Sequence, residues 1–151
     1  MPMELKLESG KHKATYTIMK QYIITGLRIV LGGFFVLYAV IKFLGIQFPK
    51  MYLREPIDQI DSVTLLWYFF GYSQSYMLTA ATGELIAGIL IAVPKTAKIG
   101  VLFYFPLALN IAVINWGFGL SWDVKTLSTF LALSSFYLFL RDIPTYRKLL
   151  V

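Results

Sequence analysis

The stretch Met77-Leu-Thr-Ala-Ala-Thr-Gly-Glu-Leu-Ile-Ala-Gly-Ile-Leu-Ile-Ala-Val93 decides the fold class of this chain. It is apolar apart from two threonines and Glu84, and with the residues just before it the stretch reaches the length of about 20 residues that a membrane-spanning helix needs. A carboxylate at the centre of such a helix costs roughly 2.5 to 3.5 kcal/mol on insertion scales, so it is expected to face the protein interior. The remaining sequence must therefore supply a partner or a task for Glu84.

The composition predicts an integral membrane protein, because 58% of the 151 residues are hydrophobic and only 15% are charged. The chain has no cysteine and a single histidine, His12, which excludes disulfides, thiolate metal sites and a histidine-ligated haem within the membrane. The sequence thus offers no metal or haem ligands, and any redox role would require a bound cofactor, such as a quinone, or one supplied by a partner.

Four apolar segments predict an all-α, four-helix transmembrane bundle with spans at about 22–44, 74–93, 99–118 and 124–140. Pro94 is expected to end the second span, and Asp123 is expected to be the N-cap of the fourth. The fourth span is expected to end in Arg141-Asp142-Ile143-Pro144.

The same pattern divides the chain into a polar segment (1–21), a transmembrane domain (22–141) and a short basic tail (142–151). Residues 1–21 lack the short apolar core of a cleavable signal, so we expect the first span to be retained.

The basic residues predict which side of the membrane the termini occupy. With four spans, both termini and the loop near Pro94 lie on one side, which collects nine basic residues: Lys6, Lys11, Lys13, Lys20, Lys95, Lys98, Arg141, Arg147 and Lys148. The other side has Lys50, Arg54 and Lys125. The positive-inside rule therefore predicts cytoplasmic termini, and the net charge of +6 does not imply nucleic-acid binding.

The first extramembrane loop contains the aromatic stretch Leu65-Leu-Trp-Tyr-Phe-Phe-Gly-Tyr72, which is too short to span a bilayer. Two interpretations are open. In one, Trp67, Tyr68 and Tyr72 anchor the protein at the membrane interface, where such side chains are enriched. In the other, the segment is the lid of a pocket within the membrane.

Two cations of the first span, Arg28 and Lys42, are candidate partners for Glu84. They are fourteen residues apart, so their directions on a helix differ by only about 40° and they share a face. Depth along the spans favours Arg28 as the partner, whereas Lys42 is expected near the outer boundary, where it can extend to the headgroups. The Arg28–Glu84 pair is either a structural link between helices or part of a functional polar site.

Small residues predict which helices pack together. The face of the first span that carries Arg28 also carries Gly32 and Ala39, and the Glu84 face of the second span carries Ala87 and Gly88. Small residues allow close approach of membrane helices, so these two faces are expected to meet.

Two asparagines in the third span complete the set of candidate site residues. Asn110 lies near the depth of Glu84 and follows Pro106, which removes a backbone hydrogen bond to Leu102. Asn115 points about 140° away from Asn110 on a helical wheel. Both either form ordinary interhelical hydrogen bonds or join Arg28, Lys42 and Glu84 in a buried polar cluster.

Several motifs together resemble the DoxX-like family of small four-helix membrane proteins. These are the stretch Arg28-Ile-Val-Leu-Gly-Gly-Phe-Phe-Val-Leu-Tyr-Ala-Val-Ile-Lys42, the stretch Gly83-Glu84-Leu-Ile-Ala-Gly88 with Pro94-Lys-Thr-Ala-Lys98-Ile-Gly100, and Pro106 with Asn110. The chain departs from the family at Tyr38 and Ala39, where a glycine commonly precedes the lysine. The resemblance implies an inner-membrane four-helix bundle, and family members include the small membrane subunit of an archaeal thiosulfate:quinone oxidoreductase.

Two functions follow as expectations. The first is an accessory or docking subunit of a redox-associated membrane complex, not catalytic on its own, with membrane lipid and another membrane subunit or a second copy as partners. The second is an intramembrane binding site for a quinone or another lipid-like molecule. A small proton-coupled transporter is a weaker third, because the sequence shows no repeats.

Overall fold

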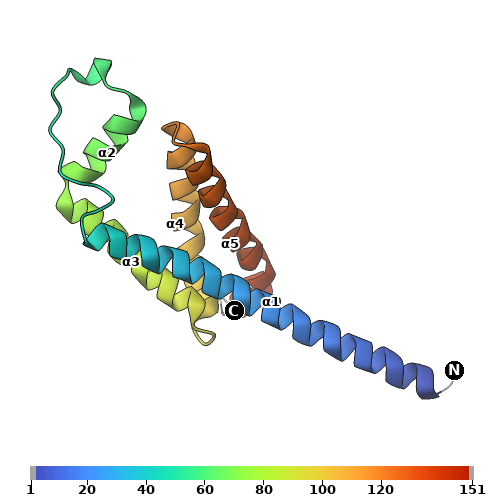
Figure 1. Ribbon diagram of the computed structural model, residues 1–151. Coiled ribbons are helices and arrows are strands. Elements are labelled where there is room, and N and C mark those ends of the chain that lie inside the picture. Colours follow the sequence, from blue (N-terminus) through green and yellow to red (C-terminus); the bar gives the residue numbers. More distant parts are fainter. Residues whose placement is uncertain (1–2, 150–151) are drawn as a thin grey trace.

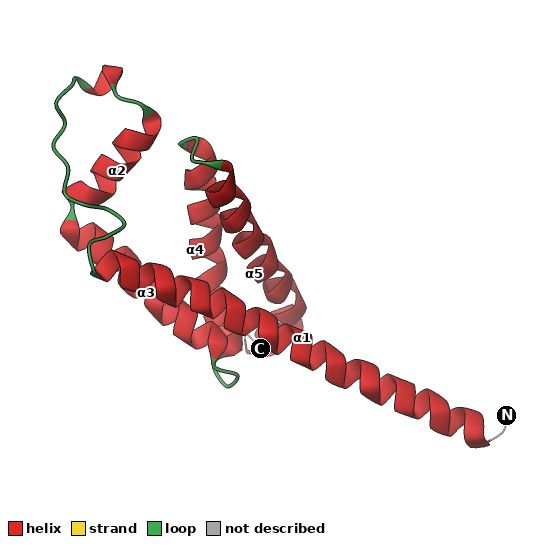
Figure 2. Cartoon of the chain, in the orientation of Figure 1, coloured by secondary structure: helices red, strands yellow, loops and turns green. Residues whose placement is uncertain are grey.

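The computed structural model describes the backbone of residues 3–149 and the side chains of residues 15–148. Within these residues the protein is all-α and has no strands (Figure 2). The side chains of Lys6, Lys11, His12 and Lys13 lie outside the described range.

Three helices of the described chain are long and apolar enough to cross a membrane: α1 (Met3–Phe43), in which Thr15–Phe43 meets this criterion, α3 (Gln74–Ala92) and α4 (Ala97–Gly117). Their bounds confirm the apolar segments expected from the sequence. The end of α3 just before Pro94 also confirms that this proline terminates the helix.

Two left-handed glycines end α1 and α4. Gly45 has a φ of 69° and Gly119 a φ of 72°, a backbone region that glycine adopts without steric penalty. At the end of α1, the Ile46 N–H donates to Ile41 O and the Gly45 N–H to Lys42 O, the two bonds of a Schellman motif. The chain therefore turns sharply where each helix stops.

The remaining helices are α2 (Ser62–Tyr72) and α5 (Trp122–Leu149), with a short 3-10 turn, η1 (Ile57–Gln59), in the loop before α2. The expected end of the last helix at 141–144 was wrong, because α5 continues through Pro144 to Leu149. Contacts with α4 hold these final turns: the Tyr146 hydroxyl donates to Lys98 O at 2.8 Å and Lys98 Nζ donates to the Thr145 hydroxyl at 2.9 Å.

The N-cap predicted at Asp123 was also wrong. Asp123 lies inside the first turn of α5, which begins at Trp122. A carboxylate in that turn is still favourable, because it faces the positive end of the helix dipole.

The helices pack in a chain of neighbours: α1 crosses α3, α3 packs on α4, and α4 lies beside α5 (Figure 1). The α1–α3 crossing confirms the expected meeting of small residues, because a Cβ added to Gly32 would lie 2.5 Å from Gly88 O. Tyr104 of α4 fills the centre of the core, where its ring stacks on Phe35 at 3.7 Å and its hydroxyl donates to Leu31 O at 2.9 Å.

The N-terminal part of α1 extends beyond the other helices (Figure 1). All side chains from residue 15 to residue 23 are exposed, and Ile24 is the first buried side chain of the described part of this helix.

Candidate functional site

The partner of Glu84 is Lys42. Lys42 Nζ donates to both carboxylate oxygens of Glu84, at 2.7 and 2.9 Å. Only 6% of Lys42 and 4% of Glu84 are exposed. The pair therefore joins the last turn of α1 to the middle of α3 and is buried between these helices.

The expected pairing of Arg28 with Glu84 was wrong, and side-chain direction explains the error. Gly32 meets Gly88, so Lys42 lies about 15 Å along α1 from the crossing, and Glu84 about 6 Å from it along antiparallel α3 in the same direction. Side chains on a helix point toward its N-terminus, so Lys42 and Glu84 reach toward each other and close this gap. Arg28 lies on the other side of the crossing and points away.

Arg28 instead forms an ion pair with Asp142 of α5, with 2.7 Å between Nη2 and Oδ2. Asp142 is 4% exposed, and the Arg28 Nε atom is buried with no hydrogen-bond partner among the described residues. Asp142 was not among the residues predicted for the site, because it was expected at the end of the fourth span. The pair ties α1 to α5 at the same end of the fold as Lys98 and Tyr146.

A cavity of about 360 Å³ lies against the Lys42–Glu84 pair and is bounded by all five α-helices and the segment that follows α1. Its walls are mainly apolar, and among the described residues Lys42 and Glu84 are the only charged side chains that line it. The uncharged polar side chains on its wall are those of Gln47, Asn110, Asn115 and Ser128, with the tyrosines Tyr38 and Tyr76.

Asn110 and Asn115 both line this cavity, so the structure brings together two asparagines that a helical wheel separates. Asn115 is 8% exposed, whereas Asn110 is exposed. No side-chain hydrogen bond of either amide is found among the described residues, so neither asparagine is the interhelical link that was the simpler alternative. Of the side chains that line the cavity, those of Asn110 on α4 and Tyr76 on α3 are exposed.

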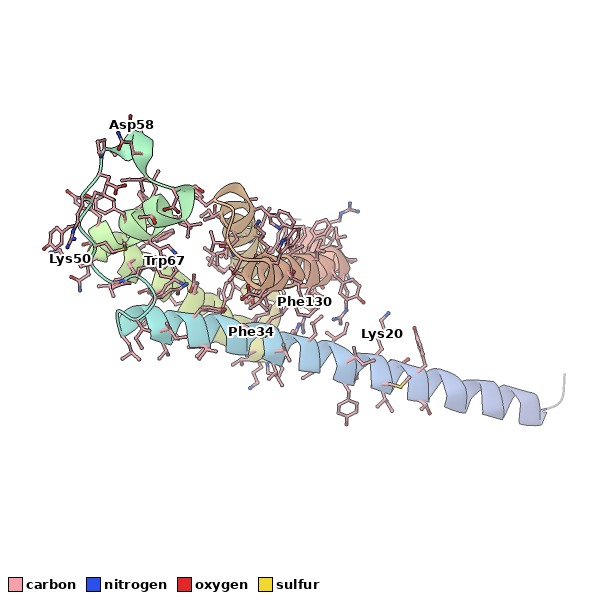
Figure 3. The ribbon with its side chains drawn as sticks, turned by 45° about the horizontal axis from the view of Figure 1, so that its top comes forward. Lys20, Phe34, Lys50, Asp58, Trp67 and Phe130 are labelled. Carbon is pink, nitrogen blue, oxygen red and sulfur yellow. The ribbon has the colours of Figure 1, made fainter. Side chains whose placement is uncertain are left out.

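Helix α2 covers the cavity with Leu66, Trp67 and Phe70. Figure 3 shows Trp67 on the inner side of α2, whereas Asp58 lies at the far end of the loop. Phe48, just after α1, stacks on Phe70 with 4.6 Å between ring centroids and lies 5.0 Å from the Trp67 ring. Of the three expected lid residues, only Trp67 lines the cavity.

Tyr68 and Tyr72 do not line the cavity. Their rings contact each other at 5.6 Å, and Tyr72 is 72% exposed. Phe48 lines the cavity but was not predicted from the sequence. Its one signal in the sequence is that it is the first aromatic residue after Gly45, the glycine that ends α1.

Helix α2 is attached at both of its ends. Asp61 caps its N-terminus by accepting hydrogen bonds from the N–H groups of Val63 and Thr64, and the Ser62 hydroxyl donates to Phe118 O at 2.9 Å. Near its C-terminus, Gly71 packs against the backbone of Pro49, where a Cβ would lie 2.5 Å from the carbonyl oxygen. The hydrogen bonds from the side chain and backbone N–H of Thr64 lower the pKa of Asp61 below its usual value.

The chemistry of the site is hydrogen bonding within an apolar cavity. No group of three or more histidine, cysteine or acidic side chains suited to a metal ion is found among the described residues. A lysine ammonium has three donors and a carboxylate about four acceptor positions. Because the ion pair uses two of each, both groups retain hydrogen-bonding capacity at the cavity wall.

Comparisons with known proteins give one informative match. The chain is similar to the uncharacterized protein YwoB of Bacillus subtilis (strain 168), with 34% identity over 104 residues. The match covers 69% of this chain and 66% of that protein, slightly less than two thirds of its length. No family model and no solved structure matches the chain.

Proposed function

We propose that this protein binds a small, net-neutral, apolar molecule in the cavity beside Lys42 and Glu84. The observation that carries the proposal is a buried ion pair at the wall of a cavity that is mainly apolar. Apolar walls with a few convergent polar groups are the usual make-up of a small-molecule site. The cavity volume of about 360 Å³ falls within the range of roughly 300 to 1,000 Å³ that such sites occupy.

The energetics of the pair support a binding role over a purely structural one. Desolvation of two charges offsets much of their attraction, so apolar replacement of a buried ion pair is often neutral or stabilising. The α1–α3 contact is also held by Gly32 against Gly88, which does not depend on the charges. The α1–α3 crossing does not require the Lys42–Glu84 pair, whereas ligand binding at the cavity gives the pair a function.

The charge of the site supports a neutral ligand. Lys42 and Glu84 compensate each other, and no other charged side chain of the described part of the chain lines the cavity. An ionic ligand would lose its hydration without gaining a counter-charge, which is unfavourable in an apolar environment. We propose that the ligand enters on the α4 side, near exposed Asn110, beneath α2.

The proposed topology places α5 as a fourth span, which makes the protein a four-helix membrane bundle like the DoxX-like proteins that it resembles. The polar side chains of α5 include Ser128 and Ser135, which are buried and donate to backbone carbonyls of the same helix, so they are satisfied without water. With four spans, the distribution of basic residues favours cytoplasmic termini, and the resemblance to the DoxX-like proteins favours an inner-membrane location.

Native mass spectrometry of the protein in lipid nanodiscs tests the proposed function. Ala80 lines the cavity, so Ala80→Phe fills part of it, whereas Ile86→Phe changes a side chain of the same helix that is 49% exposed. We expect the wild type and Ile86→Phe to retain a neutral small molecule and Ala80→Phe to lose it. Equal occupancy in all three proteins would overturn the proposal.

A second proposal is an accessory subunit that docks a partner in a redox-associated membrane complex. It is supported by the exposed part of α1, where Tyr16, Met19, Tyr22 and Ile23 are each more than half exposed although they are large and apolar. Co-purification in mild detergent tests this proposal. The control is Leu133→Glu, because Leu133 of α5 is 62% exposed. Loss of a stoichiometric partner in Tyr22→Glu, with its retention in Leu133→Glu, would support the proposal. A wild-type protein that purifies without a partner would contradict it.

A further inference from the structure

Gln47 has an unused acceptor atom beside the cavity. Its Oε1 atom is buried and has no hydrogen-bond partner in the described part of the chain, and the side chain lines the cavity. A buried polar atom left unpaired costs about 1 to 3 kcal/mol, so such atoms usually have a partner in the functional state. Gln47 therefore marks a position where a bound molecule is expected to supply a donor.

Gln47 lies at the same end of the cavity as Lys42. It is the second residue after Gly45, which ends α1 immediately beyond Lys42, and the ring of the next residue, Phe48, is centred 6.0 Å from Lys42 Nζ. The Tyr38 ring is centred 5.7 Å from the same nitrogen. The cation is thus enclosed by aromatic rings and by the carboxylate of Glu84.

Lys42 presents an unused donor at this end. Two hydrogen bonds to the Glu84 oxygens are the only side-chain hydrogen bonds of Lys42 within the described residues, and an ammonium carries three N–H groups. The third N–H is therefore free to donate to a further acceptor, and a neutral acceptor suits the site because Glu84 already compensates the charge.

We propose that the ligand presents a hydroxyl group at this end, accepting a hydrogen bond from Lys42 Nζ and donating one to Gln47 Oε1. This inference rests on the proposed binding function and names its ligand class, an apolar alcohol such as a phenol. A hydroxyl both donates and accepts, whereas a ketone or quinone carbonyl only accepts and would leave Gln47 Oε1 unpaired.

The size and lining of the cavity define the rest of the ligand. A dry cavity of roughly 150 Å³ holds a benzene molecule, so a cavity of about 360 Å³ accommodates a substituted ring with a short chain. The rings of Phe35, Phe48, Trp67 and Phe70 line it. Aromatic rings pack favourably in offset or edge-to-face geometry, which favours a phenol over a saturated alcohol.

Binding can be measured through Trp67, the only tryptophan that lines the cavity. In a Trp116→Phe, Trp122→Phe background, 4-(4-bromobutyl)phenol and 4-(4-bromobutyl)toluene are titrated against the protein in nanodiscs, and bromine quenching of Trp67 reports occupancy. The two probes differ only by hydroxyl against methyl. The ratio of their dissociation constants is compared between wild type, Gln47→Leu and Gln74→Leu. Gln74→Leu is the control, because Gln74 does not line the cavity. Partitioning of the probes into lipid is the same for all three proteins, so it cancels when their ratios are compared.

In each protein, the preference for the phenol is the dissociation constant of the toluene divided by that of the phenol. We expect this preference to be about tenfold greater in the wild type and in Gln74→Leu than in Gln47→Leu, because Gln47→Leu loses one hydrogen bond in a buried site. Gln47→Leu should leave toluene binding unchanged, which shows that the cavity is intact. Binding of both probes with the same ratio in all three proteins would overturn the hydroxyl assignment while leaving the proposed function standing.

Two further outcomes complete the test. No saturable quenching by either probe would contradict the proposed function itself. A short-chain benzoquinone that competes with the phenol in wild type and loses affinity in Gln47→Leu would show that Gln47 donates to a carbonyl, and would also overturn the assignment.

Discussion

Replacing Gly32 by alanine should separate α1 from α3, whereas the same change at the adjacent Gly33 should not. A Cβ at Gly32 would lie 2.5 Å from Gly88 O and 2.9 Å from the Cβ of Ala92. The first of these atoms belongs to the backbone of a helix, so a change of rotamer cannot relieve the contact. A Cβ at Gly33 meets nothing within 4 Å.

The magnitude follows from the difference between the two variants. Both replace a glycine inside α1 and both gain the helix propensity of alanine, about 1 kcal/mol, so this contribution cancels. Overpacking of a close contact typically costs about 1 to 3 kcal/mol. We therefore expect Gly32→Ala to be less stable than Gly33→Ala by about 2 kcal/mol.

Reversible unfolding by SDS in mixed micelles measures this difference. Gly88→Ala should resemble Gly32→Ala, because its Cβ would lie 2.9 Å from Gly32 O and 3.1 Å from the Cβ of Phe35. Equal unfolding free energies for Gly32→Ala and Gly33→Ala would refute the close crossing. The register that brings Lys42 to Glu84 would then lose its support.

Three further predictions concern the lid, the second ion pair and the topology. Because hydrogen bonds lower the pKa of Asp61, the Asp61 cap stabilises α2 fully at pH values above the usual aspartate pKa, and this stabilisation is lost as the pH falls through the lowered pKa. The emission of Trp67, which lies on α2, should therefore change in acid. Asp61→Asn caps the helix without titrating and should abolish this change. Asp142→Ala leaves Arg28 buried without its partner and should destabilise the protein by about 3 kcal/mol in SDS unfolding, whereas an Arg28→Met, Asp142→Leu double variant should recover most of this loss. Since the chain has no cysteine, Asp58→Cys should react with an impermeant maleimide on intact cells and Lys148→Cys only after permeabilisation; the reverse pattern would contradict the proposed orientation.

The sequence predicted the elements whose signals are local. Apolar length identified three helices, α1, α3 and α4, that could cross a membrane, Pro94 ended α3, and the small residues Gly32 and Gly88 were correctly expected at the helix contact. These features depend on one segment, or on a property that two faces share. The predicted end of the last helix was wrong, because contacts between the last turns of α5 and Lys98 outweigh the unfavourable effect of Pro144.

The site was predicted only in part, because its geometry depends on the crossing of two helices. Depth measured from the ends of the spans favoured Arg28 for Glu84, but the Gly32–Gly88 contact sets a different register. That contact together with the N-terminal tilt of helical side chains would have favoured Lys42. Gln47 and Phe48 were missed because they follow α1 in a segment without regular structure, and only the tertiary fold brings them to the cavity.

The central claim is that the Lys42–Glu84 pair exists for ligand binding more than for stability. A Lys42→Met, Glu84→Leu double variant removes both charges without leaving either unpaired, so its unfolding free energy should stay within about 1 kcal/mol of the wild-type value. In the single-Trp67 background, its affinity for 4-(4-bromobutyl)phenol should fall at least about tenfold, because the donor to the hydroxyl is gone. Two results would contradict the account. One is a stable double variant with unchanged affinity for the phenol. The other is a large loss of stability while the protein that remains folded retains its affinity.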